Sequence, residues 1–290
     1  SSRAPRPPPP RRSPPGRLAR LFGWLIGTGR SGTALARPYG VAVSTDGTRL
    51  YAADSDAAQV LVFNFPRGRV ERLETSGAAR MSVPIGVACG PDGRVYVTDA
   101  DQRRVKVFDA QGRFLTQFGR AGDGVGEFRR PTGIAVDRAR GRVYVVDTQQ
   151  QRVHAFTLEG ATVAVLGGPG QGPGQFSMPT GAAVDRDGNL YVVDTFNCRV
   201  QVFGPDGAFR LAFGERGDQA GQFARPKMAA VDPEGHVYVT DAMFHTIQVF
   251  DGQGRLLMFF GEPGNGAGGF SGPTGVAADG GDGLYVADSL

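Results

Sequence analysis

Short apolar runs separated by turn residues recur along the chain, and the fourth copy of this pattern is the clearest. Residues 181–184 are wholly apolar, residues 190–193 are β-branched and aromatic, and residues 199–203 alternate polar with apolar side chains. A further run at 209–213 follows the turn sequence Pro-Asp-Gly. Such runs between turns are typical of β-strands, and a wholly apolar run indicates a strand buried on both faces. The pattern therefore predicts four antiparallel strands whose burial decreases from the first to the last.

This four-strand unit occurs six times. Each copy opens on a proline that precedes an apolar run, and these prolines are Pro38, Pro84, Pro131, Pro179, Pro226 and Pro273. Successive prolines lie 46, 47, 48, 47 and 47 residues apart. Repeats of this length, with four strands and no helical periodicity, are typical of propeller blades. The expected fold class is all-β: a six-bladed β-propeller over residues 38–290.

The two ends of the chain depart from the repeat. The sixth copy stops just after Asp288, so we expect an incomplete last blade and read the chain as a fragment that lacks at least one strand. Residues 18–37 are expected to pack on or close the ring, either as a fourth strand or, given apolar residues at helical spacing, as a short helix. Residues 1–17 hold seven of the 20 prolines, which predicts a disordered, Pro/Arg-rich tail or spacer.

Three motifs recur with the repeats: Pro-x-Gly-(Val/Ile)-Ala-Val, Gly-x-(Val/Leu)-Tyr-Val-(Val/Thr)-Asp and Arg-Val-x-Val-Phe. Together they resemble the NHL-repeat family over about residues 30–290. The resemblance implies a propeller with a binding surface, and its similarity to bacterial extracytoplasmic members implies an exported protein, whether periplasmic, outer-membrane-associated or extracellular. It does not name a function, because one fold hosts many functions.

The net charge of +4 does not point to nucleic acid once it is divided along the chain. The first 30 residues hold seven arginines and no acid, so the rest has 32 − 7 = 25 basic against 28 acidic residues. Lysine occurs only at positions 106 and 227, and the arginines are spread around the predicted ring. A nucleic-acid site would concentrate basic residues on one face. RNA binding, known for some NHL domains, is therefore kept only as an alternative, and no apolar stretch is long enough to span a membrane.

Each second strand ends in an aspartate. The third strand begins five residues after it, and in three repeats the first residue of that strand is arginine. The residues concerned are Asp54, Asp99, Asp147, Asp194 and Asp241, with Arg104, Arg152 and Arg199. A ring of equivalent acids offers no asymmetric site for acid–base chemistry. A short carboxylate can instead accept hydrogen bonds from turn N–H groups, and arginine can bridge to a neighbouring blade. We expect these residues to be structural.

The zinc-dependent peptidyl-hydroxyglycine amidating lyases, an NHL-like family, place histidines directly after the blade proline. Here those positions hold Tyr39, Ile85, Thr132, Thr180, Lys227 and Thr274. His154, His236 and His245 fall at different repeat positions and are not expected to converge on one zinc. Cys89 and Cys198 also occupy unmatched positions, so a disulfide is not expected. We therefore expect no catalytic residue, metal or cofactor, with a propeller-type lyase or hydrolase as the alternative.

The Gly-rich segments between repeats are expected to be interblade linkers. This includes 264–269, which matches a dinucleotide-binding pattern but is followed by a strand instead of a helix. The linkers after the second to fifth repeats end in a phenylalanine that should anchor them, at Phe128, Phe176, Phe223 and Phe270.

The repeats disagree mainly in the loops between second and third strands and just after the prolines. Strand order places both sets at one end of the ring, where a protein or peptide partner is expected to bind. The candidate contact residues are Tyr39, Phe196, Lys227, Met228, Met243, Phe244 and His245.

Overall fold

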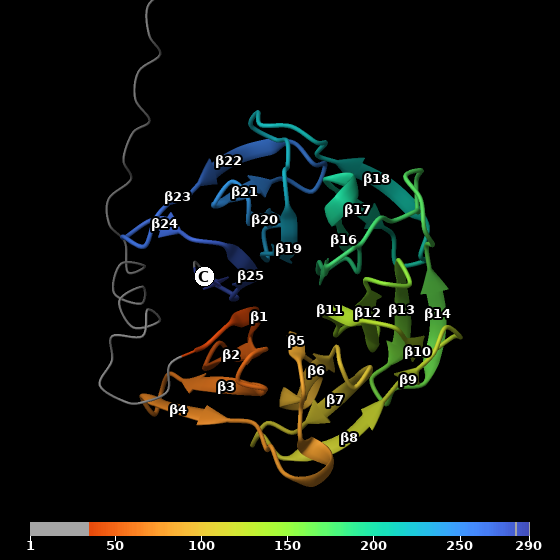
Figure 1. The fold of residues 1–290 in the computed structure, drawn as a ribbon, viewed down its shortest axis with the longest axis vertical. Helices are drawn as coiled ribbons and strands as arrows, with labels where there is room; N and C mark the ends of the chain where they lie inside the picture. Colours follow the sequence, from red (N-terminus) through yellow and green to blue (C-terminus); the bar gives the residue numbers. More distant parts are fainter. Residues whose placement is uncertain (1–34, 282, 290) are drawn as a thin grey trace, which may run out of the picture. The chain divides into compact units, whose positions relative to one another are not determined.

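The computed structural model describes residues 35–281 and 283–289, so the expectations for residues 1–34 lie outside the described residues. In the described part, five sheets of four antiparallel strands and one sheet of two strands are arranged around a common axis (Figure 1). Each sheet corresponds to one sequence repeat. The predicted blades are therefore present, and within the described residues blade six has two strands, which is compatible with the incomplete last blade expected from the sequence.

The strand bounds follow the repeats closely. Blade one contains β1 (Pro38–Val43), β2 (Arg49–Asp54), β3 (Gln59–Asn64) and β4 (Arg69–Arg72). Blade two contains β5 (Pro84–Cys89), β6 (Val95–Asp99), β7 (Arg104–Phe108) and β8 (Phe114–Phe118). Blade three contains β11 (Pro131–Asp137), β12 (Arg142–Asp147), β13 (Arg152–Thr157) and β14 (Thr162–Leu166).

The remaining blades repeat this layout. Blade four contains β15 (Gly181–Val184), β16 (Leu190–Asp194), β17 (Arg199–Phe203) and β18 (Phe209–Phe213). Blade five contains β19 (Pro226–Val231), β20 (Val237–Asp241), β21 (Thr246–Phe250) and β22 (Leu256–Phe260). Blade six contains β25 (Pro273–Ala278) and β26 (Leu284–Asp288).

In every blade the first strand lies nearest the axis and later strands lie progressively outward (Figure 1). Burial falls in the same order: β5 is buried throughout, whereas β8 of the same blade is mostly exposed. The opening proline of β1 pairs with Asp54 at the end of β2, and blades two, three, five and six repeat this register. The proline ends of inner strands and the loops after second strands therefore share one end of the ring.

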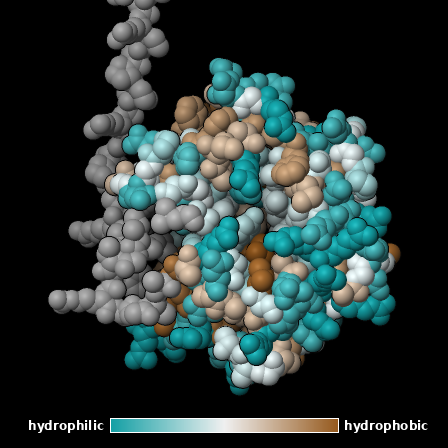
Figure 2. Space-filling model, viewed as in Figure 1, coloured by the Kyte–Doolittle hydropathy of each residue, from teal (hydrophilic) through white to brown (hydrophobic). Residues whose placement is uncertain are grey.

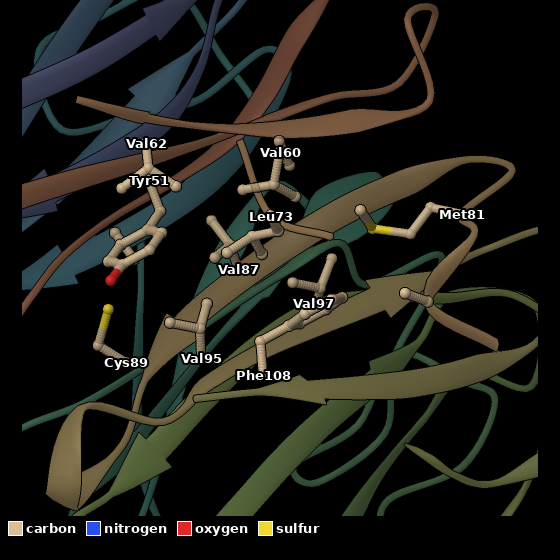
Figure 3. Close-up of a cluster of buried hydrophobic side chains, with 13 residues drawn as sticks. Tyr51, Val60, Val62, Leu73, Met81, Val87, Cys89, Val95, Val97 and Phe108 are labelled. Atoms are coloured by element: carbon tan, nitrogen blue, oxygen red, sulfur yellow. The ribbon is translucent and has the colours of Figure 1, made fainter. Parts of the chain in front are cut away.

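Apolar side chains from facing sheets fill the seams between blades. Between blades one and two, Tyr51 and Leu73 lie over Val87, Cys89 and Phe108 (Figure 3). Burial raises the pKa of the Cys89 thiol to about 12, so this cysteine is an unreactive core residue. Removing such packed apolar surface from water is the main stabilising contribution to a fold of this kind.

The interblade linkers share one backbone arrangement, in which two short segments pair in parallel. These are β9 (Arg120–Ala121) with β10 (Glu127–Phe128), β23 (Glu262–Pro263) with β24 (Gly269–Phe270), and the single bridges Pro169–Phe176 and Arg216–Phe223. Phe128, Phe176, Phe223 and Phe270 are all buried, which is the anchoring role expected for them. The first linker differs, since it contains the 3-10 turn Gly77–Ala79 and buries Leu73 and Met81 instead of a phenylalanine.

Inner strands approach one another closely around the axis. A Cβ atom on Gly86 would lie 2.3 Å from the carbonyl oxygen of Thr132 in the next blade, and Gly40, Gly133, Gly181 and Gly275 are similarly confined. Threonine hydroxyls donate across the same seams, for example from Thr98 to the Thr132 carbonyl at 2.6 Å. Between blades six and one, the Thr274 hydroxyl donates to the Tyr39 carbonyl at 3.2 Å. The inner layer of the ring is thus continuous even though blade six is short.

No helix among the described residues is long and apolar enough to cross a lipid bilayer.

Candidate functional site

The end of the ring that carries the proline ends of the inner strands is called the loop face here. It also carries the loops between second and third strands, residues 55–58, 100–103, 148–151, 195–198 and 242–245. The candidate contact residues all come from these loops or from positions next to the prolines. The repeats vary here, whereas the strands that support the loops are alike.

The aspartates beneath this face are occupied by backbone N–H groups. Asp147 accepts hydrogen bonds from the backbone of Arg129 and Arg130 before its own inner strand, and from Gln149 and Gln150 in its loop, at 2.6–3.1 Å. Asp241 makes the same four-fold arrangement in blade five. The carboxylates of Asp54, Asp99, Asp147, Asp194 and Asp241 are fully buried. This geometry is that of a structural staple between strand entry and loop.

Arg199 extends one staple to a linker. Its Nε donates to Asp194 at 2.9 Å, and its Nη2 donates to the carbonyls of Gly172 and Gln175, which precede the inner strand of blade four. Arg104 and Arg152 occupy the same position at the start of β7 and β13, and both are half-buried. Arg199 thus supports its loop and the preceding linker from below.

Each complete blade closes its loop with a residue in the left-handed backbone region. These residues are Ala58, Arg103, Gln151, Cys198 and His245, with φ between 51° and 57°. None is glycine, so each loop holds a conformation that L-residues adopt at some cost in free energy. Because this backbone conformation recurs in five blades, it is a common property of the loops and does not mark one blade as a reaction site.

The candidate contact residues differ in exposure. Phe196 and Met243 are 57% and 58% exposed, although both are large and apolar. Phe244 and His245 are half-buried in the same loop as Met243. Met228 does not fit the expectation of a contact residue. It is 7% exposed, packs with Ala230 and Val276 and lines the cavity at the axis, at a position where other blades place glycine.

Tyr39 and Lys227 both follow an inner-strand proline, and both are half-buried at the axial end of the loop face. Burial raises the pKa of the Tyr39 phenol, and the charges of Arg130, Arg225 and Arg37 oppose that rise. Burial and the charges of Arg225 and Arg37 lower the pKa of Lys227 to about 8, and Asp241 acts in the opposite direction.

Sequence reasoning missed the arginines at this end. Arg37, Arg130 and Arg225 directly precede the prolines of blades one, three and five, and all three are exposed. The signal was present, since every second copy of the repeat has arginine before its proline. A comparison of the repeats position by position reveals this signal, whereas the number of arginines around the whole ring does not.

The histidines are dispersed. His154 is buried in β13, His236 bonds Asp232 in the hairpin before β20 at the opposite end, and His245 lies on the loop face. Within the described ranges, no three histidine, cysteine, aspartate or glutamate side chains are grouped so as to hold a metal ion.

Comparison with known families agrees with the repeat pattern and the blade geometry. A family described as a 6-bladed beta-propeller matches residues 71–164, and one described as an NHL repeat matches residues 176–203. The chain is an NHL-repeat β-propeller. No curated protein matches the sequence significantly.

Solved structures similar to this NHL propeller have diverse roles. A gluconolactonase from Xanthomonas campestris is 18% identical, with a TM-score of 0.65 and coverage of 88% of this chain and 84% of the other. A virginiamycin B lyase from Staphylococcus aureus, an inactive variant with one histidine replaced by alanine, solved with quinupristin, is 16% identical, with a TM-score of 0.64 and coverage of 89% and 80%. A chain of a nidogen/laminin complex is 17% identical, with a TM-score of 0.62 and coverage of 79% and 81%.

At these identities the likeness concerns the fold alone. Propellers of this shape include enzymes as well as a protein found in a complex, so the function of the NHL propeller has to be argued from its own loop face.

Proposed function

We propose that this propeller is a non-enzymatic scaffold whose loop face binds a protein or peptide partner. The observation that carries the proposal is the exposure of Phe196 and Met243 in adjacent blades. Large apolar side chains in loops have no core to fill, and exposed apolar residues with aromatic or methionine side chains are typical of recognition surfaces. The linker phenylalanines, by contrast, are buried, so Phe196 is not a further copy of that anchor.

The side chains at this face favour binding over catalysis. Asp147 and Asp241 each accept four backbone hydrogen bonds, and Asp194 accepts bonds from the backbone of Ser177 and the side chain of Arg199, which leaves these carboxylates poorly suited to move a proton. In the lyase variant described above, replacement of one histidine accompanies loss of activity. Of the three histidines in the present chain, His245 alone lies on the loop face, in a strained loop position and without a carboxylate bonded to its ring in the described structure.

A selection from a random heptapeptide library displayed on phage, with the purified propeller as bait, tests the proposal. Enriched peptides should bind the wild-type protein and lose at least tenfold in affinity, about 1.4 kcal/mol, to a Phe196→Ala/Met243→Ala variant. Leu115→Ala is the matched control, because Leu115 is 49% exposed on the outer strand β8, away from the loop face.

Two results would contradict the proposal. One is the absence of any enriched peptide. The other is enrichment of peptides whose affinity falls with Leu115→Ala but not with the loop-face variant, which would place the binding surface on the outer edge of the ring.

A further inference from the structure

A set of cationic side chains surrounds the axial end of the loop face. Arg37, Arg130 and Arg225 come from blades one, three and five, so they alternate around the ring. Their backbone N–H groups are fixed by the buried aspartates, at 2.9 Å for Arg37 on Asp54 and 3.1 Å for Arg130 on Asp147. The main chain therefore holds each arginine at the start of an inner strand, next to the axis. Lys227 adds a fourth cation, two residues after Arg225 in the chain.

These cations start from one end of the ring. Each arginine directly precedes the opening proline of an inner strand, and the inner strands lie nearest the axis (Figure 1). The charges of Arg130 and Arg225, from blades three and five, also lower the pKa of the Tyr39 phenol of blade one, in opposition to the effect of burial. We call Arg37, Arg130, Arg225, Lys227 and Tyr39 the axial cluster.

The axial cluster lacks compensating negative charge. Across residues 35–281 and 283–289, the side chains of Arg130, Arg225 and Lys227 make no ion pair or hydrogen bond, and Arg37 has one exposed, long pair with Asp56 at 3.9 Å. The acid that acts on Lys227 is Asp241, whose oxygens already accept four backbone N–H groups. Like charges held together without an anion repel one another, so an anionic ligand would stabilise this arrangement.

The axis below the cluster is too narrow for a ligand to enter. Val41, Val87, Ile134, Met228 and Val276 surround a cavity of about 30 Å³, which has room for one or two water molecules. Apolar atoms are visible at the centre of the ring among hydrophilic surroundings (Figure 2). A bound group would therefore stay at the mouth, where it meets arginine forks, an ammonium group and a phenol. Those donors suit the planar oxygens of a carboxylate.

We propose that the axial cluster binds a carboxylate of an acidic peptide segment, with Phe196 and Met243 contacting apolar residues beside it. This rests on the proposed function and specifies the partner's chemistry. A peptide is favoured over RNA because the cluster holds only four cations. Residues 35–290 as a whole carry 25 basic and 28 acidic residues, a balance of −3. Nucleic-acid sites need a longer basic track to follow the phosphate backbone.

The phage-selected heptapeptides provide the test. Peptides enriched on the wild-type protein should carry aspartate or glutamate next to apolar residues. Measured by fluorescence anisotropy with a rhodamine label, the best peptide should bind at least tenfold more weakly to an Arg130→Gln/Arg225→Gln variant. Its Asn/Gln counterpart should bind the wild-type protein at least tenfold more weakly than the acidic form. Arg186→Gln is the control, because Arg186 is an exposed arginine in the hairpin before β16, at the opposite end of the ring.

The outcomes separate the two proposals. Enriched peptides without acidic residues, or acidic peptides insensitive to the Arg130→Gln/Arg225→Gln variant, would overturn the carboxylate site and leave the binding scaffold standing. No enriched peptide would overturn both. If poly(U) RNA binds more tightly than the acidic peptide and is released by the same arginine variant, the cluster is a nucleic-acid site and the peptide proposal is wrong.

Discussion

The third residue of the third strand determines whether the third strand makes a side-chain hydrogen bond to the backbone of the preceding linker. In three blades it bonds the backbone of the preceding linker: Lys106 to Ala78 at 2.7 Å, Gln201 to Gln175 at 2.6 Å and Gln248 to Gln222 at 2.7 Å. Blade three has His154 there. The corresponding linker carbonyl, that of Glu127, is bonded by Gln150 instead, at 2.9 Å.

His154 is consequently a buried imidazole whose two ring nitrogens find no partner among the described residues. It packs against the Phe128 ring, with centroids 5.3 Å apart. Burial lowers its pKa, an effect that Asp147 opposes and Arg152 reinforces. The folded protein therefore holds this histidine neutral.

This gives a pH dependence of definite sign. Because the folded pKa lies below the unfolded value of about 6.5, the unfolded chain takes up the proton first as pH falls. Stability should be unaffected above that pH and decline below it, by up to about 1.4 kcal/mol per pH unit. Urea unfolding of a His154→Leu variant at pH 7.5 and pH 5 should show a smaller decline than the wild type; blade one already carries leucine at this position, Leu61. An equal decline in both proteins would disprove this account.

The two lysines also differ in chemistry. Lys227 is half-buried with a pKa of about 8, whereas Lys106 is 1% exposed and its ammonium donates to a backbone carbonyl. A neutral amine is the nucleophile toward acylating reagents, so Lys227 should react faster than Lys106. Peptide mapping by mass spectrometry after brief acylation between pH 6 and 10 should show Lys227 modified first, with a rate that rises through about pH 8. Preferential modification of Lys106 would contradict this prediction.

At the scale of strands, the ring depends on glycine and threonine where inner strands meet. Glycine allows the backbones to approach, and threonine hydroxyls bond the carbonyl that this approach brings near. Blade five is the exception, because Met228 replaces the glycine and its side chain packs with Ala230 and Val276. The hydroxyl of Thr240 still crosses that seam to the Thr274 carbonyl at 2.7 Å.

Gly86→Ala tests the steric part of this arrangement. The new Cβ would lie 2.3 Å from the Thr132 carbonyl oxygen, in a place where the strands cannot separate without losing the Thr98 bond. Forcing extra atoms into a packed interior costs about 1–3 kcal/mol, and chemical denaturation should show a loss in that range. Gly168→Ala is the control, because a Cβ atom at that position would have no neighbouring atom within 4 Å, so stability should change by less than about 0.5 kcal/mol. Equal stability of the two variants would rule out a tight seam.

At the scale of the whole molecule, repetition explains what could be predicted from the sequence. Four strands per blade, linker anchors such as Phe128 and the shared end of loops and prolines follow from local periodicity copied six times. Features that arise only when the ring closes were not predictable in that way. Met228 was expected at the surface and is buried because blade six meets it. The axial cluster joins residues from alternate blades, which no local window of sequence contains.

Closure also makes one seam unlike the others. The Thr274 hydroxyl bonds backbone 235 residues away in blade one, whereas the Thr180 hydroxyl bonds the Lys227 carbonyl 47 residues away, at 2.6 Å, across blades joined by a linker. In the described ring, contacts between segments far apart in the sequence hold the six–one seam closed, whereas a linker also connects blades four and five. We therefore expect local opening of the described ring to begin at the six–one seam.

Thr274→Val, compared with Thr180→Val, tests this expectation by native-state hydrogen exchange. Both variants lose one hydroxyl donor and should cost about 1–3 kcal/mol, because each leaves a buried carbonyl with fewer partners. In Thr274→Val the amides of β1 and β25 should exchange at least tenfold faster while those of β11 stay protected. In Thr180→Val the amides of β1 and β25 should keep the wild-type rate. If Thr274→Val instead raises exchange uniformly around the ring, the propeller opens as one cooperative unit and the six–one seam is no weaker than the rest.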